Sequence, residues 1–81
     1  MSKTVTVKYF ATLREQRGTD SEVLSTDSIS VSDLYRELKN EHCFKLNEAV
    51  VRAAVNDRFV DSDFALEDGA TVVFIPPVAG G

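Results

Sequence analysis

The feature that most limits the possible folds of this 81-residue chain is its long amphipathic segment, residues 31–41. Four apolar residues occupy positions i, i+3, i+4 and i+7 of this segment: Val31, Leu34, Tyr35 and Leu38. That spacing predicts a helix with one apolar stripe. Because the stripe must be buried against another element, we expect the helix to lie across a sheet.

Signals for the start of this helix precede it. Ser30 can cap the first turn, and Asp33 follows at the spacing of a capping box, with Asp in place of the usual Glu. Ile29, before the cap, and Leu34, the fourth helical residue, have the spacing of a hydrophobic staple. The helix is therefore predicted to begin at Val31.

The remaining elements are mostly strands. Residues 3–10 alternate, which predicts a half-buried strand whose core-facing residues are Val5, Val7 and Tyr9. Residues 11–17 favour a short helix, and Gly18 can end it in the left-handed conformation. Further strands are predicted at residues 22–25, 49–55, 58–60 and 70–75, with tight turns at Asn56-Asp57 and Asp68-Gly69.

The length and order of these elements predict one α+β domain with a mixed sheet packed on one main helix. Pro76 and Pro77 end the last strand, since neither can donate a ladder hydrogen bond. We therefore divide the chain into a domain, residues 1–75, and a flexible tail, residues 76–81.

The last strand, residues 71–75, is apolar on both faces, although the main helix can cover only one. If Val72 and Phe74 point inward, four apolar residues are expected on the opposite surface: Phe10, Phe59, Val73 and Ile75. An exposed apolar patch on so small a domain favours an interface. The alternative is that loops cover these residues.

Charge and composition exclude several classes of partner. Thirteen acidic and nine basic residues give a net charge of −4, and the basic residues are scattered, which argues against nucleic acid. A basic partner surface is expected instead. Neither a long apolar run nor a secretory signal is visible, and the one cysteine, Cys43, allows no internal disulfide. We expect a soluble, cytoplasmic protein that binds no membrane.

The end of the sequence carries the chemistry. Gly80 and Gly81 have no side chains, so they can enter a channel too narrow for any Cβ, and the terminal carboxyl carbon is open to attack. The stiff Pro-Pro stem would hold the arm, continued by Val78 and Ala79, off the domain. A free carboxylate must first become an acyl adenylate, which needs ATP. Because the chain has no phosphate loop, we assign ATP to an activating partner.

Other candidate sites are weaker. His42 and Cys43 are adjacent, but without a second ligand pair at zinc spacing they favour a structural role. Asp57, Asp61 and Asp63 lack the Gly and the distal Glu of a calcium loop, and are interpreted as solvated turn residues. No metal site and no stably bound cofactor are predicted.

Several motifs along essentially the whole chain resemble a known family. They are residues 7–11 (VKYFA), Leu13-Arg14-Glu15 with Gly18, residues 53–56 (AAVN), residues 66–69 (LEDG) and residues 72–81 (VVFIPPVAGG). Together they resemble the small, sulfur-carrying subunit of molybdopterin synthase, the MoaD family. Ala70 departs from the acidic residue common there, and we expect it to weaken the hydrogen bonding of the preceding turn.

The resemblance implies a ubiquitin-like β-grasp fold whose first and last strands are central, parallel neighbours. It also implies a cycle in which a ubiquitin-activating-like adenylyltransferase adenylates Gly81 and a persulfide donor converts it to a thiocarboxylate (1-thioglycine). The large catalytic subunit would then use that sulfur to form the dithiolene of molybdopterin, in a heterotetramer of two small and two large subunits. This small subunit would not be catalytic on its own. By the same resemblance, Phe10, Arg14, Phe59 and Ile75 face the partner.

Alternative functions stay open at this point. The same tail chemistry serves a sulfur carrier of another pathway, such as thiamine synthesis. It also serves a ubiquitin-like modifier joined through Gly81 to lysines of other proteins. A third alternative is a non-covalent interaction domain with an idle tail. A stand-alone enzyme is least favoured, because no nucleophile–base pair is visible.

Overall fold

The computed structural model describes residues 2–47 and 50–77. The elements are, in chain order, β1 (Lys3–Tyr9), α1 (Ala11–Arg17), β2 (Ser21–Thr26), α2 (Val31–His42), β3 (Arg52–Val55), β4 (Arg58–Val60) and β5 (Thr71–Ile75). This order agrees with the one predicted from the sequence.

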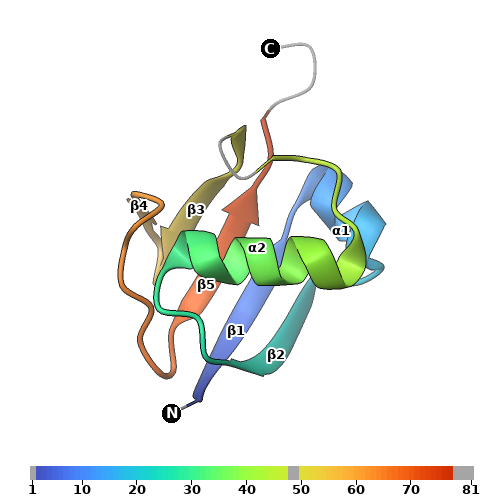
Figure 1. The fold of residues 1–81 in the computed structure, drawn as a ribbon. Coiled ribbons are helices and arrows are strands. Elements are labelled where there is room, and N and C mark those ends of the chain that lie inside the picture. The colour runs from blue at the N-terminus through green and yellow to red at the C-terminus, as the bar shows by residue number, and fades with distance from the viewer. Residues whose placement is uncertain (1, 48–49, 78–81) are drawn as a thin grey trace.

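The strands form one mixed sheet in the order β2-β1-β5-β3-β4. β1 and β5, from opposite ends of the chain, are parallel neighbours at its centre, and the other neighbouring pairs are antiparallel. α2 crosses one face of the sheet (Figure 1), which we call the inner face. The expected central pair and the single main helix on the sheet are both confirmed.

The core lies between α2 and the inner face. Its fully buried members come mainly from β1, β5 and α2, and include Val5, Val7, Tyr9, Val72, Phe74, Leu34 and Leu38; Leu13 of α1 is also fully buried. Since successive strand residues point to opposite faces, the intervening residues of β1 and β5 point away from the helix. The strand alternation predicted for both segments is confirmed.

The first turn of α2 is capped as predicted, but the hydrophobic staple is wrong. The backbone N–H of Asp33 donates to Ser30 Oγ at 3.2 Å. Leu34 is buried, whereas Ile29 is 74% exposed. The Ile29 carbonyl accepts a hydrogen bond from the Leu66 N–H at 2.8 Å. This hydrogen bond joins Ile29 to a distant loop, and its side chain is exposed. The local spacing of residues 29 and 34 does not reveal such a contact.

β3 is shorter than the predicted strand over residues 49–55. It begins at Arg52, and part of the predicted range lies outside the described residues. Just before it, the Val50 N–H donates to the Asn47 carbonyl at 3.1 Å. The Val50 N–H therefore already has an acceptor outside the sheet, and the ladder begins after it.

The β3–β4 hairpin turns at Asn56 and Asp57, as predicted. Both have positive φ, 51° and 74°, as a type I′ turn requires. Asn56 is also tied to β5, because its N–H donates to the Thr71 carbonyl and its Oδ1 accepts from the Thr71 N–H. The hairpin is thereby fixed against the central strand.

The turn before β5 is well hydrogen-bonded without an acidic residue at position 70. The Gly69 N–H donates to the Thr4 carbonyl and the Thr4 N–H donates to Asp68 Oδ1, both at 2.7 Å. Ala70 is buried, and its carbonyl accepts from the Thr6 N–H at 3.0 Å. The weakening expected from Ala70 is therefore offset by bonds to β1.

A polar cluster joins α1, β1 and β2. Glu22 accepts from the Tyr9 hydroxyl at 2.5 Å and from Arg17 Nε and Nη2 at 2.9 and 2.7 Å. The hydrogen bonds from Arg17 lower the pKa of Glu22, despite partial burial. Burial, together with the Glu22 carboxylate, raises the pKa of Tyr9. We call these three residues the Tyr9–Glu22–Arg17 cluster.

Candidate docking face and tail root

The sheet face opposite α2, the outer face, changes character along the strands. Strand register assigns its side chains as Thr4, Thr6, Lys8, Ser21, Val23, Ser25, Arg52, Ala54, Phe59, Thr71, Val73 and Ile75. Polar residues predominate where β1 and β5 begin. Apolar residues gather where β5 ends, next to the tail.

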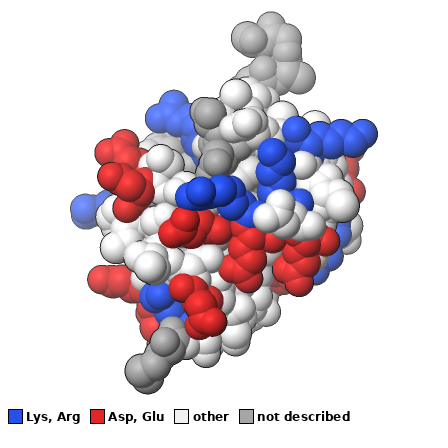
Figure 2. All heavy atoms as spheres, viewed as in Figure 1, with Lys and Arg blue, Asp and Glu red and all other residues white. Residues whose placement is uncertain are grey.

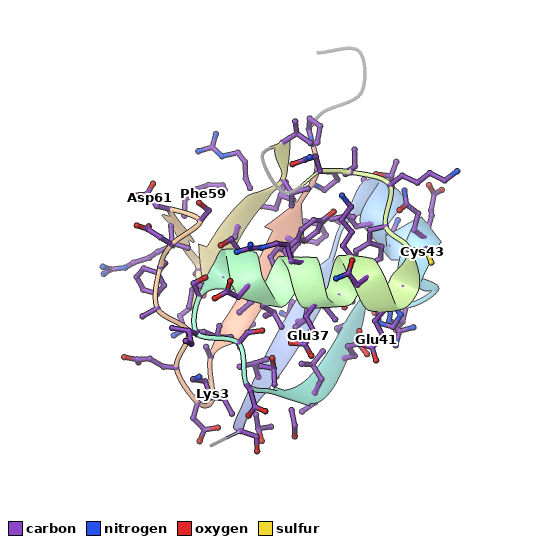
Figure 3. All side chains as sticks on the ribbon, viewed as in Figure 1. Lys3, Glu37, Glu41, Cys43, Phe59 and Asp61 are labelled. Carbon is purple, nitrogen blue, oxygen red and sulfur yellow. The ribbon has the colours of Figure 1, made fainter. Side chains whose placement is uncertain are left out.

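One row of side chains crosses the apolar part of this face. Lys8 of β1 lies beside Val73 of β5, Val73 beside Ala54 of β3, and Ala54 beside Phe59 of β4. Phe59 is 65% exposed, at the β4 edge of the molecule (Figure 3). Val73 and Ile75 are half-buried, in contrast to Phe74 of the core. The described loops therefore leave this patch accessible.

Arg52 extends the row toward the tail. It lies beside Ile75 in the β3–β5 register, and its guanidinium carbon stands 5.0 Å from the centre of the Phe59 ring. A guanidinium at this distance is attracted by the ring's quadrupole. The contact helps to hold an exposed aromatic side chain in place.

Phe10 and Arg14 are at the opposite side of the patch. Phe10 follows β1, is 48% exposed, and its carbonyl accepts the Leu13 N–H at 3.1 Å at the start of α1. The next residue, Ala11, has a φ of 52°, a conformation that costs a non-glycine residue free energy. This bend turns the chain from strand into helix. Phe10 and Arg14 line a shallow hollow of about 270 Å³ together with Lys8, Tyr9, Asp20 and Ser21.

The tail begins beside this patch. β5 runs parallel to β1 with Phe74 opposite Tyr9, so its end lies next to the start of α1. Pro76 is buried and Pro77 is exposed. The boundary after residue 75 stays a prediction, and the burial of Pro76 favours a tail that begins at Pro77. Val78, Ala79, Gly80 and Gly81 lie outside the described residues.

The charges on the outer face differ in sign from the net charge of the chain. Among the outward strand positions, the charged residues are Lys8 and Arg52, and no carboxylate is present. Acidic side chains gather instead on the helix side of the molecule (Figure 2), where Glu37 and Glu41 project from α2 (Figure 3). The outward strand positions therefore differ in sign from the total charge, from which a basic partner surface was expected. That expectation stays a prediction.

Sequence reasoning placed Phe10, Arg14, Phe59, Val73 and Ile75 on a common surface, and the structure places them at or beside the apolar part of the outer face. The sequence did not predict three other residues of this face: Lys8, Arg52 and Ala54. Lys8 could have been found from the alternation of residues 3–10, which puts it on the same side as Thr6. Arg52 could not have been found in this way, because the strand predicted over residues 49–55 was longer than β3 and did not fix which face Arg52 occupies.

The other candidates remain structural. Cys43 is exposed and ends α2 with a φ of 58°. His42 packs against Phe44, with ring centres 5.8 Å apart. Within residues 2–47 and 50–77, no three His, Cys, Asp or Glu side chains are grouped to hold a metal ion. Asp57 is a turn residue, as interpreted.

Within residues 2–47 and 50–77, neither helix is long and apolar enough to cross a bilayer.

A mixed sheet with central parallel strands and one crossing helix defines a ubiquitin-like β-grasp domain. A Caldiarchaeum subterraneum ubiquitin matches over 100% of both chains with a TM-score of 0.65 at 15% identity, which supports the fold alone. The chain belongs to the ThiS family, which it matches over residues 7–81.

Individual relatives show which members of the family this chain is similar to. The chain is 35% identical, over 80 residues, to the molybdopterin synthase sulfur carrier subunit of Escherichia coli (strain K12), covering 95% of this chain and 99% of that protein. A Pyrococcus furiosus structure described as molybdopterin converting factor subunit 1 is 38% identical, with a TM-score of 0.78 and coverage of 94% and 99%. The resemblance inferred from the sequence is confirmed.

Two further structures bear on partners and alternatives. A complex of subunits 1 and 2 of molybdopterin-converting factor from Helicobacter pylori matches with a TM-score of 0.63 at 26% identity, over 96% of this chain and 99% of that one. Small archaeal modifier protein 1 of Methanosarcina acetivorans matches with a TM-score of 0.77 at 25% identity, over 100% and 99%.

Proposed function

We propose that this protein is the sulfur carrier subunit of a molybdopterin synthase. The observation that carries the proposal is the accessible apolar patch beside the root of a Gly-Gly tail, in a chain similar to sulfur carrier subunits along nearly its whole length. A partner that covers Phe59 and Ile75 would receive the tail directly into an adjoining channel. The domain docks and the tail reacts.

The chemistry uses the Gly81 carboxylate. In the adenylating partner, this carboxylate attacks the α-phosphate of ATP and releases pyrophosphate, giving an acyl adenylate. A persulfide then attacks the acyl carbon and releases AMP, and a thiol reductant cleaves the resulting S–S bond to leave a thiocarboxylate. In the large subunit, the sulfur passes to a cyclic pyranopterin precursor, and water restores the carboxylate. The chain itself supplies the reacting carbonyl group, the tail that carries it to the partner and the domain that binds the partner. No stably bound cofactor is proposed.

The partners follow from this cycle. They are the large catalytic subunit, in a heterotetramer of two small and two large subunits, an adenylyltransferase and a persulfide donor. The Helicobacter pylori complex supports the first, because its small subunit shares this fold. The cytoplasm, where the activating enzymes have ATP, is the proposed compartment.

Mass spectrometry of the C-terminal peptide tests the proposal. Protein purified from cells able to activate it should partly carry one oxygen-to-sulfur exchange on Gly81. Removing Gly81, or adding one residue after it, should abolish molybdopterin formation and leave the melting temperature unchanged. A chain without Gly81 that still supports cofactor synthesis would overturn the proposal.

The second candidate is a protein modifier, favoured by the match to small archaeal modifier protein 1. Both functions begin with the same activated tail, so they differ in the acceptor. Gly-Gly remnants on lysines of other proteins, without any thiocarboxylate, would establish the modifier. The reverse pattern would establish the carrier.

A further inference from the structure

Two cations flank the apolar part of the outer face. Lys8 on β1 lies beside Val73, and Arg52 on β3 lies beside Ile75. Both residues are exposed, and within the described residues neither forms an ion pair. With strands about 4.8 Å apart and a rise of about 3.4 Å per residue, their Cα atoms are roughly 12 Å from each other. The two charges therefore lie on either side of β5.

A partner that covers Val73, Ile75 and Phe59 must also cover these charges. Arg52 packs on the Phe59 ring, so the ring cannot be buried without removing water from the guanidinium. Lys8 is adjacent to Val73 in the same row. A desolvated cation without a counter-charge opposes binding strongly, whereas one that meets a carboxylate does not.

We propose that Lys8 and Arg52 determine which protein surface can cover the outer face: one that is apolar at its centre and presents a carboxylate opposite each cation. This rests on the proposed function, which identifies that surface as part of the large synthase subunit. The two-sided arrangement, with apolar side chains between single cations, suits a protein surface. A nucleic-acid backbone would instead require a continuous basic stripe.

Calorimetric titration of the complete chain with the large subunit tests the proposal. Raising salt from about 0.1 M to about 1 M shortens the Debye length from about 10 Å to about 3 Å, so wild-type affinity should fall. At the lower salt, Lys8→Glu and Arg52→Glu should each weaken binding at least about tenfold. Lys8→Gln and Arg52→Gln should give smaller losses, and all four losses should shrink at high salt.

Two controls separate charge from other effects. Lys39→Glu makes the same charge change on α2, on the opposite face of the sheet, and should leave affinity within about twofold of wild type. Arg52→Lys keeps the charge but loses the planar stacking on Phe59, so it should bind nearly as wild type if charge decides. Circular dichroism melting confirms that each variant is folded.

The outcomes distinguish this proposal from the function on which it rests. Failure of the folded wild type to bind the large subunit would overturn the proposed function. Wild-type binding that Lys8→Glu and Arg52→Glu weaken no more than Lys39→Glu does would overturn the role of the two cations and leave the proposed function standing. Losses that persist unchanged at high salt would likewise exclude an electrostatic role.

Discussion

Phe74 and Ile75 are neighbours in β5, yet their side chains lie on opposite faces of the sheet. Phe74 is in the core and Ile75 is half-buried on the outer face. Phe74→Ala should lower the free energy of unfolding by about 3–5 kcal/mol, because it leaves a cavity. Ile75→Lys should barely shift the melting temperature but weaken binding to the large subunit about thirtyfold, equivalent to about 2 kcal/mol.

Phe59→Glu provides a second variant on the same patch, and it should behave as Ile75→Lys does. Melting temperature and partner affinity are measured for all three proteins. Unfolding by the patch variants would mean that the outer face is part of the core. No change in either quantity would mean that the patch is not the docking face.

The two prolines at the tail root form another pair with opposite environments. Replacing either by Ala frees the unfolded chain to the same extent, so the difference between the variants reports burial. Pro76→Ala should be less stable than Pro77→Ala by about 1–2 kcal/mol, the transfer free energy of about two methylene groups. Chemical denaturation measures the difference, and equal stabilities would place the start of the tail at residue 76 after all.

Which single residues are buried was partly predictable. The alternation in residues 3–10 and 71–75 decides the face of each side chain, because the period of a strand is two. Ile29 and Pro76 were not predictable. The Ile29 carbonyl accepts a hydrogen bond from Leu66, far along the chain, and Pro76 is buried although its strand has ended. The spacing of nearby apolar residues in the sequence predicts neither of these features.

Among the elements, α2 depends on its cap. Ser30→Ala should destabilise the protein by about 1 kcal/mol, because the Asp33 N–H loses its acceptor at the helix start. Ser25→Ala, at an exposed position of β2, makes the same chemical change without a cap. Urea denaturation of both variants should separate them, and equal losses would show that the Ser30 bond contributes nothing.

The Tyr9–Glu22–Arg17 cluster makes the packing of α1 against β2 depend on pH. Folding lowers the pKa of Glu22 below its ordinary value of 4.5. The stabilisation is therefore fully present above that pH and is lost as the pH falls through the lowered pKa. Glu22→Gln should be less stable than wild type at neutral pH, and the difference should shrink in acid.

Denaturation curves recorded at a series of pH values measure this change. Glu67→Gln is the control, since Glu67 is exposed and its side chain has no hydrogen bond to a described residue. A constant difference between wild type and Glu22→Gln at every pH would show that the cluster acts through shape rather than charge.

Element order, caps and hairpin turns were predictable because each has a local cause, such as the left-handed Gly18 or the Asn56-Asp57 turn. The start of β3 was not. The sequence is apolar enough for a strand from position 49, but the Val50 N–H donates to the Asn47 carbonyl and β3 begins only at Arg52. The position of Arg52 on the outer face depended on that later start.

For the whole molecule, the total charge differs in sign from the outward strand positions of the candidate docking face. A total charge of −4 suggested a basic partner, but the outward strand positions contain two cations and no carboxylate. Total charge is a sum over all faces, and only topology assigns each charge to one of them. The resemblance to a sulfur carrier, in contrast, rested on motifs spread along the chain, which the comparisons confirm.

The central place of β5 has a mechanical consequence. A pull on the chain beyond Pro76 acts along β5, which is paired over four residues with β1 on one side and over four with β3 on the other. Such a load shears all of these rungs at once instead of opening them one after another. A tail gripped tightly by a partner can therefore be withdrawn while the domain resists being unravelled.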